Sequence, residues 1–177
     1  WNEIIGKQPG FLGKLVGMKG TKPVDIDLGC LYELEDGSRG AIQAFGKKFG
    51  AFDKPPYIKL SGDERTGAKE GHDEYILING AHWKEIKRIL VYLYIYQGAT
   101  KWLEVAPKVF VDIPGENDLV VTLKDSDDSL ALCAVAGLEQ IRGGVRLTNH
   151  TEYFPGHPAM DRAFGFGLEW DDGQKER

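Results

Sequence analysis

The chain has 177 residues, of which 42% are hydrophobic and 28% charged, as is typical of a globular domain. Twenty-two basic residues against 27 acidic ones give a net charge of −5. No basic stripe is present, so nucleic-acid binding is not expected. No apolar run reaches the roughly 18 residues of a membrane span, and we expect a cytoplasmic protein. The 23 glycines indicate many turns between short strands.

Residues 1–21 show neither a helical nor a strand period. A phosphate-binding loop would need Gly-Lys followed by Ser or Thr, but Leu15 follows Gly13-Lys14. We therefore expect a linker or edge segment over 1–21 and one β-domain over 22–177. Because the chain opens with Trp1 rather than Met, we interpret it as a domain taken from a longer protein.

Strand-like runs follow, separated by turn residues such as Asp, Gly and Pro. The runs cover residues 24–34, 41–45, 57–60, 75–79, 86–96, 108–113, 118–123, 130–138 and 144–154. Short helices are expected only over 81–87 and 98–105. This pattern predicts an all-β fold, an antiparallel β-sandwich of about nine strands with one or two short helices.

The run at 86–96 alternates strictly at its end. Aliphatic residues occupy one face, and Tyr92, Tyr94 and Tyr96 occupy the other. The aliphatic face is expected to be core. The tyrosine face is either a platform on which a sugar or partner stacks, or a second, partly polar packing layer.

Several other features favour a binding protein over an enzyme. The four histidines do not have zinc-like spacing, and no nucleophile motif is present. Cys30 and Cys133 lie among apolar residues, as expected of buried thiols in a reducing compartment. The run KDSDD at 124–128 is interpreted as a turn.

An acidic segment runs from Gly62 to Glu74, between two expected strands. It is not an EF-hand loop, because Ala68 stands where the sharp turn of that loop needs glycine. Its chemistry nevertheless favours a hard cation such as calcium, which takes about six to eight oxygens. The carboxylates come from Asp63, Glu64, Asp73 and Glu74.

A second acidic pair, Asp25 and Asp27, lies on the strand 24–34. In a strand both project from one face, while Ile26 and Leu28 project into the core. If this strand ends near the acidic segment, six carboxylates converge. Two like charges ~4 Å apart cost roughly 4 kcal/mol at an effective dielectric constant near 20, and a divalent ion would offset that cost. The alternative is a solvated acidic loop whose charges face water.

Three motifs together resemble the TerD family of tellurite-resistance proteins: DIDL at 25–28, GDERTG at 62–67 and GHDE at 71–74. The stretches 41–67, 78–98 and 153–170 resemble the TerA branch, so the resemblance spans Lys22 to Trp170.

The resemblance implies a β-sandwich that binds calcium at a loop-rich end, in bacterial proteins linked to tellurite resistance and stress responses. Asp25, Asp27, Asp63, Asp73 and Glu74 match the acidic positions of the family, and Thr66 and Gly67 match the turn between them. Glu64 and His72 depart from the pattern. We therefore expect one calcium site rather than the two of TerD-like relatives.

The leading hypothesis is a non-enzymatic calcium-binding domain that acts as a scaffold or sensor with other proteins of the tellurite-resistance system. One alternative is a calcium-dependent lectin-like module that binds a small polar ligand on the tyrosine face. Another is a hydrolase with a metal-activated water.

Overall fold

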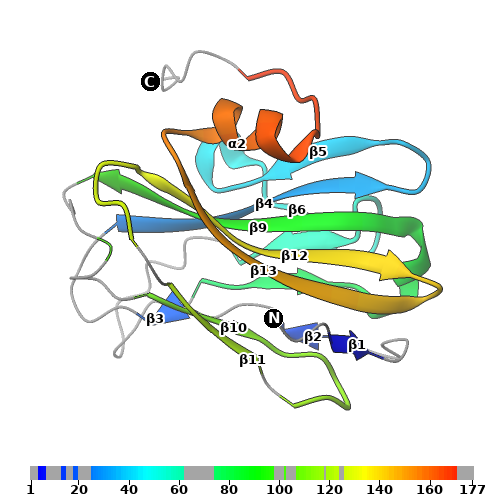
Figure 1. Ribbon diagram of the computed structural model, residues 1–177. Helices are drawn as coiled ribbons and strands as arrows, with labels where there is room; N and C mark the ends of the chain where they lie inside the picture. The colour runs from blue at the N-terminus through cyan, green and yellow to red at the C-terminus, as the bar shows by residue number, and fades with distance from the viewer. Residues whose placement is uncertain are drawn as a thin grey trace.

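The computed structural model describes most of the chain as antiparallel strands with a few short helices (Figure 1). The described residues are 4–6, 13–14, 18–19, 25–61, 74–97, 102, 107–117, 119–123 and 126–170. Every strand pairing recorded among them is antiparallel. The predicted all-β fold is confirmed.

The largest sheet, called the main sheet below, has six strands in the order β1-β13-β12-β9-β4-β5. They are β1 (Ile4–Gly6), β13 (Gly144–Phe154), β12 (Leu132–Ile141), β9 (Ile86–Gln97), β4 (Asp25–Leu34) and β5 (Arg39–Ile42). β9 lies at its centre, as its continuous apolar sequence requires.

Two smaller sheets complete the fold. One has the order β2-β8-β7-β6 and the other the order β11-β10-β3. Their strands are β2 (Gly13–Lys14), β8 (Ile76–Ile78), β7 (Ile58–Leu60), β6 (Gly50–Ala51), β11 (Leu119–Thr122), β10 (Lys108–Val111) and β3 (Met18–Lys19).

Each of the nine expected runs overlaps one of these strands, although the run 41–45 shares only residues 41–42 with β5 and β12 extends past the run 130–138. The unexpected strands are β1, β2, β3 and β6, each only two or three residues long. Such pieces are too short for an alternating pattern to show in the sequence. All four lie at sheet edges, where a neighbouring strand supplies the pairing.

One hydrophobic cluster joins all three sheets, which gives the two-layer arrangement of a sandwich. The main sheet and both smaller sheets contribute inward side chains to it. They include Leu28, Val91 and Leu93 from the main sheet, Ile58 and Ile76 from the second, and Val109 and Val121 from the third. Cys30 and Cys133 are buried free thiols, as expected, and burial raises the pKa of Cys133 to about 12.

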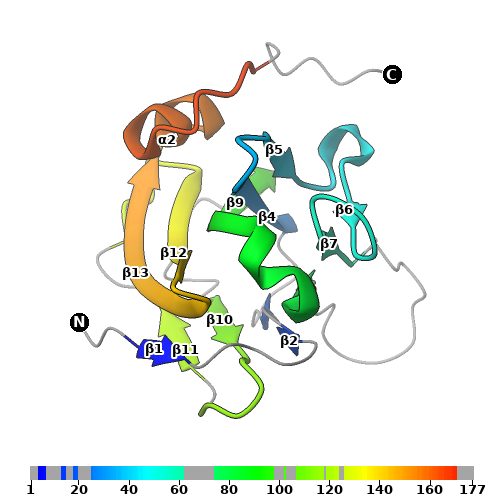
Figure 2. The same cartoon turned by 90° about the vertical axis from the view of Figure 1, so that its right-hand side faces the viewer.

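The opposite face of the main sheet is covered by α2 (His157–Phe164) and the segment that follows it. Figure 2 shows α2 and the strands β6 and β7 on opposite sides of β4 and β9. A second hydrophobic cluster lies under the helix, with Met160 and Phe166 against Leu31, Leu90 and Tyr92. The sequence reading missed this helix. Its signals are a proline in the first turn and Gly165 in the left-handed region (φ 69°) at its end.

The other helical pieces are single turns or little more. The helix expected over 81–87 is present as the 3-10 helix η2 (Gly80–Glu85), whose first turn is capped by the Asn79 side chain accepting from the Ala81 amide at 3.1 Å. η1 (Phe45–Lys47) was not expected. Of the helix expected over 98–105, only Trp102 is described, and it is helical. No helix among the described residues is long and apolar enough to cross a membrane.

Candidate metal-binding site

The structure describes three of the eight predicted site residues in part or in full. Asp27 and Glu74 are described with their side chains, and Asp25 by its backbone. The other five, Asp63, Glu64, Thr66, Gly67 and Asp73, lie outside the described residues.

The two ends of the acidic segment meet at the end of the β7–β8 hairpin. The Ser61 amide donates to the Tyr75 carbonyl at 2.8 Å, and the Tyr75 amide donates to the Ser61 hydroxyl oxygen at 2.9 Å. The hairpin register then continues with Leu60 opposite Ile76, both of them buried. The residue that follows the acidic segment is therefore held in a defined place.

Glu74 lies against β4. The Leu28 amide donates to Glu74 Oε2 at 2.8 Å, across 46 residues of sequence. Among the described residues, β5 pairs with β4 only over Cys30–Glu33, so the Leu28 amide lies beyond the end of β5. The carboxylate supplies the acceptor that a longer β5 would have provided.

Asp27 is half-buried on the face of the main sheet that α2 covers. Its neighbours Ile26 and Leu28 belong to the core on the other face, and its register partner across the strands is Tyr94. Burial, followed by the charges of Cys30 and Asp27, raises the pKa of Tyr92 well above its usual value. The negative charge of Asp27 therefore disfavours ionisation of the Tyr92 hydroxyl on the same face.

The tyrosine face proves to be a packing layer where it is described. Tyr92 is 1% exposed, and its hydroxyl donates to Gln43 Oε1 at 2.8 Å. The His157 ring of α2 covers both Tyr92 and Tyr94, with ring centroids 5.1 and 4.9 Å apart. The stacking-platform interpretation is therefore wrong for Tyr92, which is fully packed, while Tyr94 is half-buried against the same helix. The side chain of Tyr96 lies outside the described residues.

The acidic side chains described at this end of β4 are Asp27 and Glu74, and their carboxylate oxygens are of the type that suits a hard cation such as calcium. Within the described ranges, no group of three or more His, Cys, Asp or Glu side chains is arranged to hold a metal ion. The described histidines serve other contacts: His82 stacks on Tyr57 at 4.0 Å, and His150 packs on Phe164 at 4.8 Å. A soft-ligand site is not indicated.

The KDSDD turn is confirmed where it is described. Asp127 Oδ1 accepts from the Ser129 hydroxyl at 2.5 Å and from the Ser129 amide at 2.9 Å, and these two bonds lower the pKa of Asp127. Asp128 Oδ1 accepts from the Trp102 amide at 2.9 Å. Asp127 therefore stabilises the turn itself, and Asp128 binds backbone 26 residues away in the sequence.

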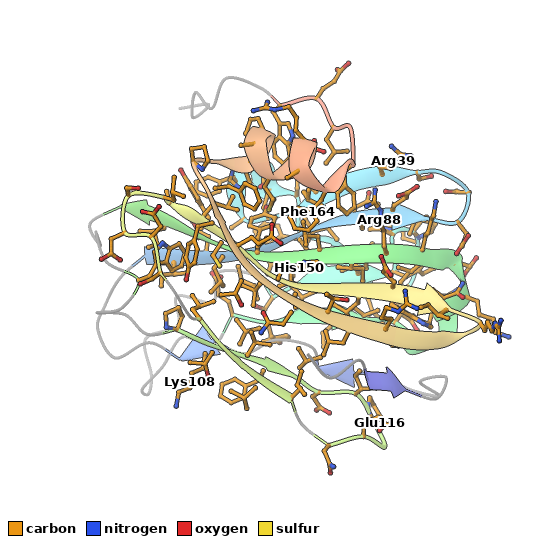
Figure 3. The ribbon with its side chains drawn as sticks, viewed as in Figure 1. Arg39, Arg88, Lys108, Glu116, His150 and Phe164 are labelled. Carbon is orange, nitrogen blue, oxygen red and sulfur yellow. The ribbon has the colours of Figure 1, made fainter. Side chains whose placement is uncertain are left out.

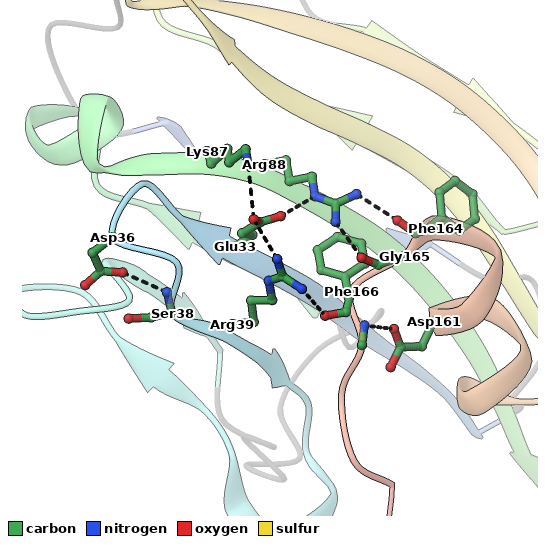
Figure 4. A network of polar contacts seen from close by, with 11 residues as sticks. Glu33, Asp36, Ser38, Arg39, Lys87, Arg88, Asp161, Phe164, Gly165 and Phe166 are labelled. Atoms are coloured by element: carbon green, nitrogen blue, oxygen red, sulfur yellow. Dashed lines mark hydrogen bonds and ion pairs between the residues drawn. The ribbon is translucent and has the colours of Figure 1, made fainter.

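A buried charge cluster lies at the other end of β4, and sequence reasoning did not find it. Glu33 is 4% exposed and accepts from Arg88 Nε at 2.7 Å, from Lys87 Nζ at 3.2 Å and from Arg39 Nη2 at 3.3 Å (Figure 4). Burial raises the pKa of Glu33, but the hydrogen bonds and charges of Arg88 and Lys87 outweigh it, and the pKa is lowered. The sequence does carry a signal for this cluster: because side chains alternate along a strand, the acidic Glu33 falls on the same face as the apolar Leu31.

The same arginines hold the end of α2. Arg88 donates to the carbonyls of Phe164 at 2.8 Å and Gly165 at 3.0 Å, and Arg39 donates to the Phe166 carbonyl at 2.9 Å. Figure 3 shows both arginines beside this end of the helix. The Arg88 guanidinium also lies 4.0 Å from the centre of the Phe166 ring.

Asp161 fixes the segment after the helix. It is 3% exposed and accepts from the amides of Gly167 at 2.7 Å and Leu168 at 2.8 Å, and from the Trp170 indole at 2.7 Å. Both buried acids of this region, Glu33 and Asp161, are therefore satisfied by groups of the chain itself.

Comparison with known proteins gives a sequence relative and several structural neighbours, two of which are described below. No family model matches the sequence. The tellurium resistance protein TerA of an Alcaligenes species is 41% identical over 168 residues, which is 94% of this chain and 49% of that protein. The chain thus spans about half the length of this curated relative.

The structural neighbours share the fold at low sequence identity. A crystal structure of a protein of unknown function has a TM-score of 0.57 at 17% identity, covering 92% of this chain and all of that one. A crystal structure of a homologue of the telluride resistance protein TerD from Streptomyces coelicolor A3(2) has a TM-score of 0.54 at 20% identity, covering 86% of this chain and 95% of that one.

Proposed function

This chain resembles the TerA and TerD tellurite-resistance proteins, as its motifs predicted, and on that premise we propose that it is a non-enzymatic, calcium-binding domain. Its role would be that of a scaffold or sensor in tellurite resistance and stress response, with other proteins of that system as partners. The observation that supports calcium binding best is the contact of Glu74 with the Leu28 amide, because it brings the acidic segment to the strand that carries Asp27.

The physical reason is electrostatic. Two carboxylates from distant parts of the sequence are held at one end of β4, and Asp73 directly precedes Glu74 in the chain. Several like charges brought close together would be costly in a domain stable by only ~5–15 kcal/mol. A calcium ion would neutralise them and link the segment to β4. The residues that would hold it are Asp25, Asp27, Asp63, Asp73 and Glu74, with Glu64, Thr66 and Gly67 shaping the segment.

The test is thermal unfolding with calcium against chelator. At 100 times the dissociation constant, calcium would stabilise the fold by ~2.7 kcal/mol, a rise in melting temperature of roughly 5–10 °C for a chain of this size. Asp63→Ala and Asp73→Ala abolish the rise, and the exposed Asp53→Ala, a matched acid elsewhere, retains it. Identical melting curves of the unaltered protein in calcium and in chelator would contradict the proposal.

A further inference from the structure

We propose that a cavity between α2 and the segment that follows it binds a small carboxylate with an aromatic or branched apolar body. The cavity has a volume of about 230 Å³. Pockets for drug-sized ligands measure roughly 300–1,000 Å³, so this one suits a smaller molecule. None of the residues that line it belongs to the proposed calcium site, so the two proposals are independent.

The walls of the cavity are held in place by the chain itself. Asp161 of α2 accepts from the amides of Gly167 and Leu168, so the segment runs back beside the helix. It also accepts from the Trp170 indole, whose ring lies against the His157 ring with the centroids 5.2 Å apart. A wall that is ordered in advance loses little conformational entropy when a ligand binds, which favours the binding of a small molecule.

The space itself depends on the turn after α2. Gly165 lines the cavity with φ 69°, and a Cβ added there would meet no atom within 4 Å. Gly167 lines it too, also with φ 69°. Both positions favour glycine, because other residues rarely adopt a positive φ. Part of the cavity is therefore left open by the backbone conformation.

The occupied polar groups of the cavity indicate an apolar body for the ligand. Asp161 is 3% exposed, and its oxygens already accept three hydrogen bonds from the chain. Because the Trp170 indole N–H is one of those donors, its ring offers apolar surface to the cavity. Pro158 and Leu168 add further apolar surface. An aromatic or branched aliphatic group packs well against such walls.

The charge of the ligand follows from Arg162, the one cation among the residues that line the cavity. Arg162 is exposed, and it makes no hydrogen bond or ion pair within the described part of the chain. A guanidinium binds a carboxylate through two parallel hydrogen bonds. Because the carboxylate of Asp161 also lines the cavity, a ligand with one negative charge is favoured over a phosphate with two.

The test follows the tryptophan indole N–H signals by NMR while phenylacetate is added, in chelator so that calcium plays no part. We expect the Trp170 signal to shift saturably, with a dissociation constant of about 0.1–1 mM for so small a ligand. Trp83 and Trp102 are buried, and their indoles donate to backbone carbonyls, so their signals serve as internal controls. Trp170→Phe assigns the Trp170 signal.

A matched ligand and three variants test the assigned roles. Phenylacetamide has the same body without the charge and is expected to bind about fivefold more weakly, as is phenylacetate to Arg162→Gln. Leu168→Trp fills the cavity and is expected to abolish binding. Lys108→Gln removes an exposed cation in the layer on the other side of the main sheet and is expected to leave binding unchanged (Figure 3).

The absence of a saturable Trp170 shift would overturn the proposal. Equal affinities for phenylacetate and phenylacetamide, or undiminished binding in Arg162→Gln, would also overturn it, because the carboxylate and the guanidinium would then not meet. Tighter binding of phenyl phosphate than of phenylacetate would show that the ligand class is wrong. Since Arg162 is exposed, its substitution leaves the core intact, and unchanged Trp83 and Trp102 signals verify that this variant is folded.

Discussion

The two ends of β4 each carry an acidic residue, but the surroundings of the two carboxylates differ. Both Asp27 and Glu33 lie on the face that α2 covers. Around Glu33 the chain places three of its own cations, led by Arg88 at 2.7 Å. At the Asp27 end it brings in another acid, Glu74, which accepts from the Leu28 amide. Cations of the chain surround Glu33, and at the other end we propose that a calcium ion binds.

This difference explains what each end is suited for. A carboxylate buried among cations of its own chain is settled once the protein folds, and it fastens α2 to the sheet through the shared arginines. The proposed calcium site would make the Asp27 end responsive to the calcium concentration. The Glu33 end serves the architecture, and the proposed role of the other end is sensing.

The largest effect is expected from Arg88→Ala, which removes one of the cations that contact Glu33. It leaves Glu33 buried with less compensation and frees the carbonyls of Phe164 and Gly165, so we expect a loss of about 3–5 kcal/mol in the free energy of unfolding, measured with urea. Lys87→Ala is the control: its side chain is 54% exposed, and its loss costs less than about 1 kcal/mol. Equal effects of the two substitutions would show that burial does not govern this cluster.

Acid is expected to weaken the opposite end of α2, where His157 lies between Tyr92, Tyr94 and Trp170. Burial lowers the pKa of His157 to about 4, so the fold favours the neutral ring. The unfolded chain takes up this proton below about pH 6.5, so the stabilisation is complete above that pH and is lost as the pH falls towards 4. The loss is at most about 3 kcal/mol.

Urea titrations between pH 7 and 4 measure this effect. His157→Phe removes a group that titrates and keeps an aromatic ring, so its stability is expected to vary less over this range. A variant with the same pH profile as the unaltered protein would assign the acid sensitivity to other groups.

Neutralising the two acids of β4 tests the comparison directly. In chelator, Glu33→Gln is expected to cost about 2 kcal/mol, because it weakens hydrogen bonds to charged partners. Asp27→Asn is expected to change the stability in chelator by less than about 0.5 kcal/mol and to remove most of the stabilisation by calcium. The comparison fails if Asp27→Asn destabilises the metal-free protein as much as Glu33→Gln does.

A smaller loss than that of Glu33→Gln is expected at the end of the described chain. Trp170→Phe keeps a ring against His157 and removes the indole bond to Asp161, which still accepts from the amides of Gly167 and Leu168. We expect a loss of about 1 kcal/mol, read from the urea midpoint. A loss above about 3 kcal/mol would mean that the indole, and not the two amides, holds this segment.

The strands were predictable because their signals are local. A strand such as β9 alternates between two faces, and turn residues mark its ends, so β9 and the other eight expected strands were found from sequence. The failures are elements whose formation depends on a neighbour. α2 has one buried face and only two turns, and β1, β2, β3 and β6 exist through pairing with longer strands.

The sequence by itself determined the all-β class, the alternation that buries Ile26 and Leu28, and the two acidic motifs with their resemblance to tellurite-resistance proteins. Only the tertiary structure decided which acids meet which partners. Glu74 reaches Leu28 across 46 residues, and Arg88 reaches Glu33 across 55. Contacts of this kind depend on sheet order and register, which no local pattern encodes, because charge acts through space rather than along the chain.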